Sequence, residues 1–139
     1  MQPQTGAVGA KLLYPNGREH HAGVVLGLGG RADHFEKGAP GGEAGYFGRL
    51  CLAHEAAAVT GACLAVDKAK FDAVGGFDAI NLPVDLGDID LCLRLAARGW
   101  TSLIAPQAEF VHRESASRGA AIPGAHRYAA EIAWFRTRW

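Results

Sequence analysis

Residues 88–98 carry the pattern that most limits the folds open to this chain. Apolar side chains recur there at helical spacing, Asp88 and Asp90 fall in the first turn, arginines lie late, and Gly99 follows. Acids near the start and bases near the end complement the helix dipole, and glycine is a common stop. Residues 100–105 are strand-like. A helix that leads directly into a strand predicts an α/β architecture.

The first third of the chain predicts strands and turns. Residues 7–14 form a strand-like run, residues 15–17 read Pro-Asn-Gly, and residues 21–26 are apolar again. This order predicts two strands that pair across a turn. Residues 27–48 lose all periodicity and hold many of the 19 glycines. They predict a long loop, a feature that is commonly functional.

The middle of the chain is apolar and then broken by a second loop. Residues 56–66 form a nearly continuous apolar run, which predicts a buried central strand. Asp67 is placed to cap a short helix that runs to residue 74, where a glycine pair ends it. Residues 77–86 have no clear period and predict a loop.

The last third ends in a helix. Pro106 is expected to break the strand before it, and residues 108–112 predict a shorter strand with His112 at its end. After a polar stretch, residues 125–139 have helical composition and stop abruptly, so we expect a truncated helix. The economical architecture is α/β, with a mixed sheet flanked by helices, a long glycine-rich loop and a C-terminal helix.

Composition argues against several classes of function. Fourteen basic residues balance fourteen acidic ones with no basic block, which argues against a nucleic-acid partner. The three cysteines are unclustered, which predicts reduced thiols in a cytosolic setting. No apolar stretch approaches the roughly 20 residues that a membrane-spanning helix needs. We therefore expect a cytoplasmic chain without a transmembrane segment.

Asp88-Ile-Asp90 is formally an Asp-x-Asp sequence, which can hold a divalent metal where it closes a strand. Here it opens a helix. One interpretation is that both carboxylates only complement the helix dipole. The other is that one carboxylate faces a cleft while its neighbour interacts with the helix terminus or with Arg94.

Three further positions are candidates for ligand contact. Thr60-Gly61-Ala62 brings small residues to the start of an apolar run, where a ligand can approach the backbone, although tight packing explains them equally well. His112 alone is more often structural than a metal ligand. His20-His21 on a strand would point to opposite faces, which prevents joint chelation and predicts exposed or structural rings.

Seven segments in fixed order resemble the C-terminal half of family 2 glycosyltransferases. The resemblance covers about residues 7–119, and the ordered series is more specific than any single motif. The segments are Val-Gly-Ala-Lys-Leu-Leu-Tyr-Pro-Asn-Gly (8–17), His-Ala-Gly (21–23), Val-Thr-Gly-Ala-Cys (59–63), Val-Gly-Gly-Phe-Asp (74–78), Gly-Asp-Ile-Asp-Leu-Cys-Leu-Arg (87–94), Gly-Trp (99–100) and His-Arg-Glu-Ser-Ala-Ser-Arg-Gly (112–119).

The resemblance implies a GT-A fold, of which residues 1–124 would be the acceptor-side half and residues 125–139 the start of a further helix. It implies an inverting transfer of a sugar from a nucleotide-diphosphate donor to a saccharide or cell-surface polysaccharide acceptor, with rhamnose-like substrates as one expectation. By similarity Asp88 would be the general base, a role that contributes about 10²- to 10⁴-fold to rate. The implied substrate-binding residues are Thr60, Gly61, Ala62, Asp90 and Trp100.

The resemblance also implies a divalent metal, Mn or Mg, in the full-length enzyme, with His112 at the metal or diphosphate site. The sequence departs from the family pattern at two positions near these residues. Gly87 stands where an acidic or amide residue is usual, and Arg113 stands where a second histidine is common. Nothing before Ala7 could form nucleotide-binding strands, so we expect a fragment that is inactive alone, from a protein that is cytoplasmic or peripheral at the inner face of the membrane.

Two other functions fit the sequence less well. The first is a carbohydrate-binding or assembly module that forms a homodimer through the surface its missing half would cover. The second is a metal-dependent hydrolase, which needs at least three converging ligands, whereas the sequence supplies His112 with Asp88 or Asp90.

Overall fold

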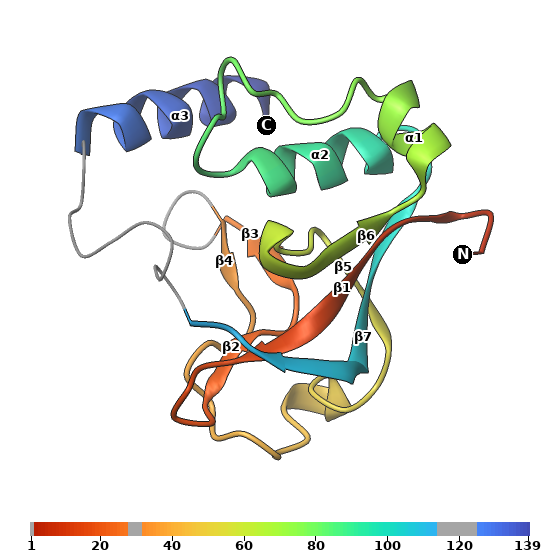
Figure 1. Cartoon of the computed structure of the whole chain (residues 1–139), viewed down its shortest axis with the longest axis vertical. Coiled ribbons are helices and arrows are strands. Elements are labelled where there is room, and N and C mark those ends of the chain that lie inside the picture. The colour runs from red at the N-terminus through yellow and green to blue at the C-terminus, as the bar shows by residue number, and fades with distance from the viewer. Residues whose placement is uncertain (1, 28–31, 114–124) are drawn as a thin grey trace.

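The computed structural model describes residues 2–27, 32–113 and 125–139. Its centre is a curled five-stranded mixed sheet, with helices packed on one side and a separate two-stranded sheet beside it (Figure 1). The predicted fold class, a mixed sheet flanked by helices, is confirmed.

The strands and helices follow one another in this order: β1 (Thr5–Leu13), β2 (Glu19–His21), β3 (Val24–Leu26), β4 (Ala32–His34), the 3₁₀ turn η2 (Tyr46–Gly48), β5 (His54–Ala56), the 3₁₀ turn η3 (Gly61–Cys63), β6 (Leu64–Val66), α1 (Lys68–Ala73), α2 (Gly87–Ala96), β7 (Thr101–Val111) and α3 (Ala125–Arg138).

Strand β1 lies at the centre of the sheet and uses both edges. Along one edge it pairs in parallel with β7, from Thr5 opposite Thr101 to Leu13 opposite Val111. Along the other edge its first half pairs with β6 and its last residues pair with β2, both antiparallel. Strand β5 extends the sheet beyond β7. Segments from both halves of the sequence therefore meet on one strand.

Helix α2 supplies much of the core. Leu91, Cys92 and Leu95 are fully buried, and they belong to the same apolar cluster as Ile104 of β7. Burying a leucine side chain stabilises a fold by about 1.5–3 kcal/mol. Strand β1 approaches Val59 so closely that a Cβ on Gly9 would lie 2.6 Å from the Val59 Cβ, which explains the glycine there. The buried side chains of α2 fix this helix against the sheet.

Several sequence predictions are confirmed. Strands β1 and β2 form the hairpin around residues 15–17, although β2 ends at His21 where the sequence predicted a strand beginning there. Helix α1 is capped by Asp67, whose side chain accepts a hydrogen bond from the Lys70 amide at 3.1 Å. Helix α2 occupies the expected position and α3 forms the expected C-terminal helix.

The prediction of one central strand over residues 56–66 is wrong. The segment is divided between β5, an irregular stretch, η3 and β6. The Thr60 hydroxyl accepts a hydrogen bond from the Ala62 amide at 3.4 Å and caps η3, so the backbone turns where the apolar composition predicted an extended chain. This turn becomes one wall of the site described below.

The prediction that Pro106 ends a strand is also wrong. Strand β7 continues through it to Val111. Its register on β1 shifts from Ala10 opposite Ala105 to Lys11 opposite Glu109, so Pro106 lies in a bulge where the ladder needs no amide hydrogen.

The long loop predicted over residues 27–48 is interrupted by β4, which pairs with β3, and by η2. Residues 28–31 of that prediction lie outside the described residues, as do residues 114–124 of the polar stretch before α3. None of the helices in the described ranges has the length and apolar character needed to cross a bilayer.

Candidate functional site

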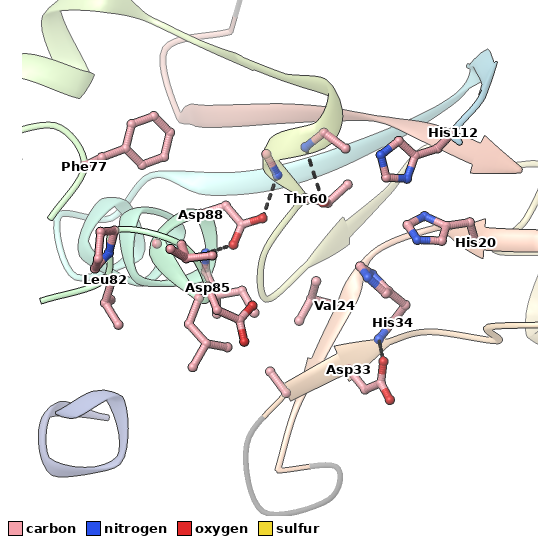
Figure 2. Close-up of a pocket in the computed structure, with 18 of the residues that line it drawn as sticks. His20, Val24, Asp33, His34, Thr60, Phe77, Leu82, Asp85, Asp88 and His112 are labelled. Carbon is pink, nitrogen blue, oxygen red and sulfur yellow. Dashed lines mark hydrogen bonds between the residues drawn. The ribbon is translucent and has the colours of Figure 1, made fainter. Parts of the chain in front are cut away.

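A cleft of about 840 Å³ lies between the start of α2, the turn at η3 and the small β3–β4 sheet. Five of the seven residues predicted for the site line it: Thr60, Gly61, Ala62, Asp88 and His112. Figure 2 shows Asp88 beside Thr60, with His112, His20 and His34 along the facing side. Residues distant in sequence thus converge on one space.

Asp88 is held at the cleft by two backbone amides. Its Oδ2 accepts a hydrogen bond from the Gly61 amide at 2.6 Å, and its Oδ1 accepts one from the Ile89 amide at 2.9 Å. A carboxylate has about four lone-pair sites, so each oxygen keeps capacity for another donor. The carboxylate of Asp88 is therefore oriented at the cleft, at the start of α2, and can accept a further hydrogen bond.

Gly61 has no side chain, and this leaves room for the Asp88 carboxylate beside its backbone. A Cβ at position 61 would lie 3.3 Å from the Asp88 Cβ and 3.4 Å from its Oδ2. Such contacts are tight enough that the carboxylate would have to move. The small residue predicted to let a ligand approach instead lets the Asp88 carboxylate approach the backbone.

The residue before α2 is strained. Leu86 has a φ of +62°, in the left-handed region that bulky side chains rarely adopt, and its side chain is nevertheless buried. Such residues persist where the surrounding packing holds them, and they cluster near functional sites. Here the left-handed turn directs the chain from the cleft-lining loop into α2.

Three histidines form the wall opposite Asp88. The ring centroids of His20 and His112 lie 4.8 Å apart, and those of His20 and His34 lie 5.0 Å apart. Lys37 and Arg113 line the same cleft. The three histidines share this side of the cleft with the carboxylate of Asp33, which lies beside His34 (Figure 2).

The expectation of exposed or structural rings at His20-His21 is met only in part. Both side chains are buried, and His20 lines the cleft. The sequence did not indicate this role because burial of β2 depends on the β3–β4 sheet and on Tyr14, which packs edge-on against His20 with ring centroids 4.7 Å apart. A strand of alternating faces predicts only one buried ring.

His112 has a buried Nδ1 with no hydrogen-bond partner among the described residues, so it fits a role as a single ligand to a metal or an anion. Within residues 2–27, 32–113 and 125–139, no three His, Cys, Asp or Glu side chains are arranged to hold a metal ion. Any metal bound with His112 would need ligands from elsewhere.

Asp85 and Glu131 belong to the site and were not predicted. Asp85 lines the cleft together with Asp88, and both are labelled in Figure 2. The buried Glu131 of α3 accepts hydrogen bonds through Oε2 from the amides of Asp85, at 2.7 Å, and Val84, at 3.2 Å. Glu131 therefore fixes the loop that carries Asp85. The only sequence signal was an acidic residue within an otherwise apolar helix face.

Asp90 and Trp100 do not line the cleft. Asp90 is fully buried, with Oδ2 2.8 Å from Arg94 Nε and Oδ1 2.9 Å from Trp139 Nε1. Trp100 lies beneath the Lys70 ammonium, 5.6 Å from the ring centroid. Both positions are occupied by contacts within the fold.

Cys92 is placed for packing and not for nucleophilic chemistry. Burial is the main cause that raises the pKa of the Cys92 thiol, outweighing its contacts with the Val59 carbonyl and Ser102. A thiol in such surroundings stays protonated and inert.

Comparison with known proteins gives four significant matches. The chain is 48% identical over 140 residues to the uncharacterized protein y4gI of Sinorhizobium fredii, covering 99% of this chain and 15% of that protein. It is 41% identical over 138 residues to the O-antigen biosynthesis protein RfbC of Myxococcus xanthus, covering 96% of this chain and 11% of that protein.

A shorter match links the chain to an N-acetylglucosaminyl-diphospho-decaprenol L-rhamnosyltransferase of Mycobacterium tuberculosis. The two are 39% identical over 61 residues, which cover 44% of this chain and 20% of that enzyme. No family model and no solved structure matches the chain. The chain spans only about a seventh or less of the length of the first two relatives.

Proposed function

We propose that this chain is the acceptor-side half of an inverting family 2 glycosyltransferase, which moves a sugar from a nucleotide-diphosphate donor to a saccharide acceptor. The names of the relatives support a glycosyltransferase-like role in polysaccharide biosynthesis. The curled mixed sheet flanked by helices is consistent with part of a GT-A fold. A rhamnosyl donor and a cell-surface polysaccharide acceptor are the substrates that these names favour.

The observation that carries the proposal is the position of Asp88. Its carboxylate opens onto the cleft and is oriented by the amides of Gly61 and Ile89. A general base must be fixed within hydrogen-bond reach of the proton it removes. A carboxylate held by backbone amides at a helix start meets that requirement, because neither contact depends on a mobile side chain.

The proposed reaction requires one proton transfer, from the acceptor hydroxyl to Asp88. As the acceptor hydroxyl oxygen attacks the anomeric carbon, its proton passes to a free lone pair of Asp88 and the bond to the diphosphate breaks. Asp85 and the Thr60 hydroxyl lie on the same side and can hold further acceptor hydroxyls. This chain would thus bind the acceptor and remove its proton.

The opposite wall suits the leaving diphosphate. Lys37 and Arg113 line the cleft and would offer positive charge, and His112 a hydrogen-bond donor, to an anion that develops there. A divalent metal, Mn or Mg, bound in the full-length protein would supply further charge neutralisation. His112 is the proposed ligand to it from this chain, and the other ligands would come from elsewhere.

The rest of the proposed enzyme would come from a longer polypeptide. The relatives extend far beyond the matched segment, which is 15% of one and 11% of another. Donor binding would therefore depend on sequence that this chain does not include. We accordingly predict no transfer by the isolated 139-residue chain, and detectable transfer would contradict that prediction.

The proposal is tested in a polypeptide that carries this segment together with its donor-binding region. Release of nucleoside diphosphate is measured with nucleotide-diphosphate sugars and saccharide acceptors. Asp88→Asn should lower kcat about 10²-fold or more. Asp72→Asn is the matched control, because Asp72 is exposed on α1 and pairs with Lys68. Equal rates for Asp88→Asn and the unchanged protein would refute the base assignment.

A second candidate is saccharide binding without catalysis, by a chain that works as a binding or assembly module. It is favoured by Phe77, which lines the cleft and is 48% exposed, because an exposed aromatic face suits a sugar ring. Calorimetry with oligosaccharides separates the two functions. Binding that survives Asp88→Asn, in a polypeptide without transfer activity, would favour the module.

A further inference from the structure

His21, at the end of β2, is a fully buried histidine whose two ring nitrogens both meet polar groups. Its Nε2 lies 3.3 Å from the backbone nitrogen of Thr60. Its Nδ1 lies 2.8 Å from Nδ1 of His34 on β4. The ring therefore bridges the η3 turn and the β3–β4 sheet, two of the three elements that border the cleft.

These contacts determine where the ring protons lie. A backbone amide can only donate, so Nε2 of His21 must accept the hydrogen bond from Thr60. Burial, followed by the nearby His34, His20 and His54, lowers the pKa of His21 to about 3, so its ring is neutral near pH 7. A neutral ring that accepts at Nε2 carries its proton on Nδ1.

The same reasoning extends to His34. The Nδ1–H of His21 can be donated only to a lone pair, so Nδ1 of His34 is an acceptor. A neutral His34 then carries its own proton on Nε2. His34 lines the cleft. The direction of this hydrogen-bond chain therefore decides whether the ring of His34 offers a ligand an N–H donor or a lone pair.

We propose that His21 is a positioning residue that holds the Thr60–Gly61 turn against Asp88 and fixes His34 as the Nε2–H tautomer. The functional part of this inference rests on the function proposed above, whereas the tautomers do not. Thr60 donates its amide to His21, and the next amide, that of Gly61, is donated to Asp88. Two consecutive amides thus tie a buried histidine to the proposed base.

The fixed tautomer has a chemical consequence for the cleft. With Nδ1 accepting from His21 and Nε2 protonated, His34 is a hydrogen-bond donor. It cannot coordinate a metal through either nitrogen, because a metal ligand needs a free ring lone pair. It cannot act as a second general base for the same reason. His34 therefore does not compete with Asp88 for the proton of the acceptor.

The tautomers are measured directly by long-range ¹H–¹⁵N correlation spectra of the ¹⁵N-labelled chain near pH 7. We expect His21 as the Nδ1–H tautomer and His34 as the Nε2–H tautomer, with assignments from His21→Gln and His34→Gln. A His21 ring protonated on Nε2, or on both nitrogens, would overturn the proposal whether or not the protein transfers sugar.

A conservative pair of variants tests the link between the two rings. In His34→Asn the amide oxygen can replace Nδ1 as acceptor, whereas His34→Leu offers no acceptor. Both variants keep the Thr60 bond to Nε2, so His21 should stay the Nδ1–H tautomer in each. Its Nδ1 proton should keep the downfield shift of a hydrogen-bonded proton in His34→Asn and lose that shift in His34→Leu. Loss or retention of the downfield shift in both variants would contradict the assigned bond.

Hydrogen exchange tests the link to Asp88. His21→Leu should speed exchange of both the Thr60 and Gly61 amides by about tenfold or more, while amides in the middle of α2 keep their protection. In the full-length enzyme the same change should lower kcat more than it raises KM. Unchanged exchange at Gly61, or a change in KM alone, would reject the positioning role.

Discussion

Asp88 and Asp90 lie two residues apart on α2, and the structure gives their carboxylates opposite surroundings. Asp88 faces the cleft and is held by the Gly61 amide at 2.6 Å, whereas Asp90 is fully buried against Arg94 at 2.8 Å. The two acids of one helical turn therefore have different roles: Asp88 faces the cleft, and Asp90 anchors the fold.

Substitution should separate the two roles. Asp90→Ala removes the buried carboxylate that pairs with the half-buried Arg94 and accepts from Trp139, and should lower the free energy of unfolding by about 3 kcal/mol. Asp88→Asn should lower it by about 1 kcal/mol or less, because only hydrogen-bond strength is lost. Urea denaturation followed by circular dichroism measures both. Equal destabilisation by the two changes would show that Asp88 is also structural.

Gly61→Ala should disturb Asp88 without unfolding the chain. The new Cβ would lie 3.3 Å from the Asp88 Cβ, so the carboxylate must shift by a few tenths of an ångström. Misplacement on the ångström scale can cost about 10²-fold in rate. Transfer by the full-length enzyme should fall while the midpoint of thermal unfolding stays nearly constant. Full activity would mean that the position of Asp88 is not critical.

Glu131→Gln should loosen the loop that carries Asp85. Hydrogen bonds to a charged acceptor are each worth about 1.5–3 kcal/mol, so the amides of Val84 and Asp85 should exchange faster and stability should fall by an amount of that order. Glu55→Gln on β5, where the side chain is exposed, is the matched control. Unaltered exchange at both amides would contradict the anchoring role.

The stability of the chain should fall as the solution is acidified below pH 6.5. The pKa of His21 is about 3 in the folded chain against an ordinary value of 6.5, so between these values the unfolded chain binds a proton that the folded chain does not. Stability then rises with pH at up to about 1.4 kcal/mol per pH unit. Urea unfolding at pH 6.5 and 5 should differ by about 2 kcal/mol from this group.

The variant His21→Gln provides the comparison for the pH experiment, because the other titrating groups remain. His34, His20 and His54 are the titratable neighbours of His21 and are present in both proteins. The pH dependence should be flatter in the variant. An identical slope in the two proteins would mean that His21 does not titrate as described.

The isolated chain should self-associate through exposed aromatic side chains. Tyr46 and Phe47 pack on each other with ring centroids 4.6 Å apart, yet they are 63% and 84% exposed. Apolar surface of this kind favours burial in an interface. Sedimentation should detect a dimer that is weakened by Tyr46→Ser with Phe47→Ser. A clean monomer would count against this prediction.

The sequence predicted the parts of this fold that depend on local pattern. Helix α2 was predictable because its acids, apolar spacing and glycine stop lie within one segment. Helix α1 was predictable from its Asp67 cap. The irregular segment at residues 57–60 was not, because its apolar composition is compatible with a strand, and a side-chain cap at Thr60 decided the outcome.

The site was predicted in part for the same reason. Asp88, His112 and the turn at Thr60 belong to the ordered motifs, so the family resemblance brought them together before any geometry was known. Glu131 and Asp85 lie 46 positions apart, and only the packing of α3 on the loop reveals their contact. The roles of His20 and His34 likewise depend on a small sheet that the sequence did not indicate.

The contacts of α3 imply thermodynamic coupling between the end of the chain and the cleft. Glu131 accepts hydrogen bonds from the amides of Val84 and Asp85, and Trp139 donates one to Asp90, two residues beyond Asp88 on α2. Anything that holds α3 in place, such as a neighbouring domain, would favour this arrangement of the cleft. By reciprocity, a ligand that binds the cleft in this arrangement would tighten that attachment by the same free energy.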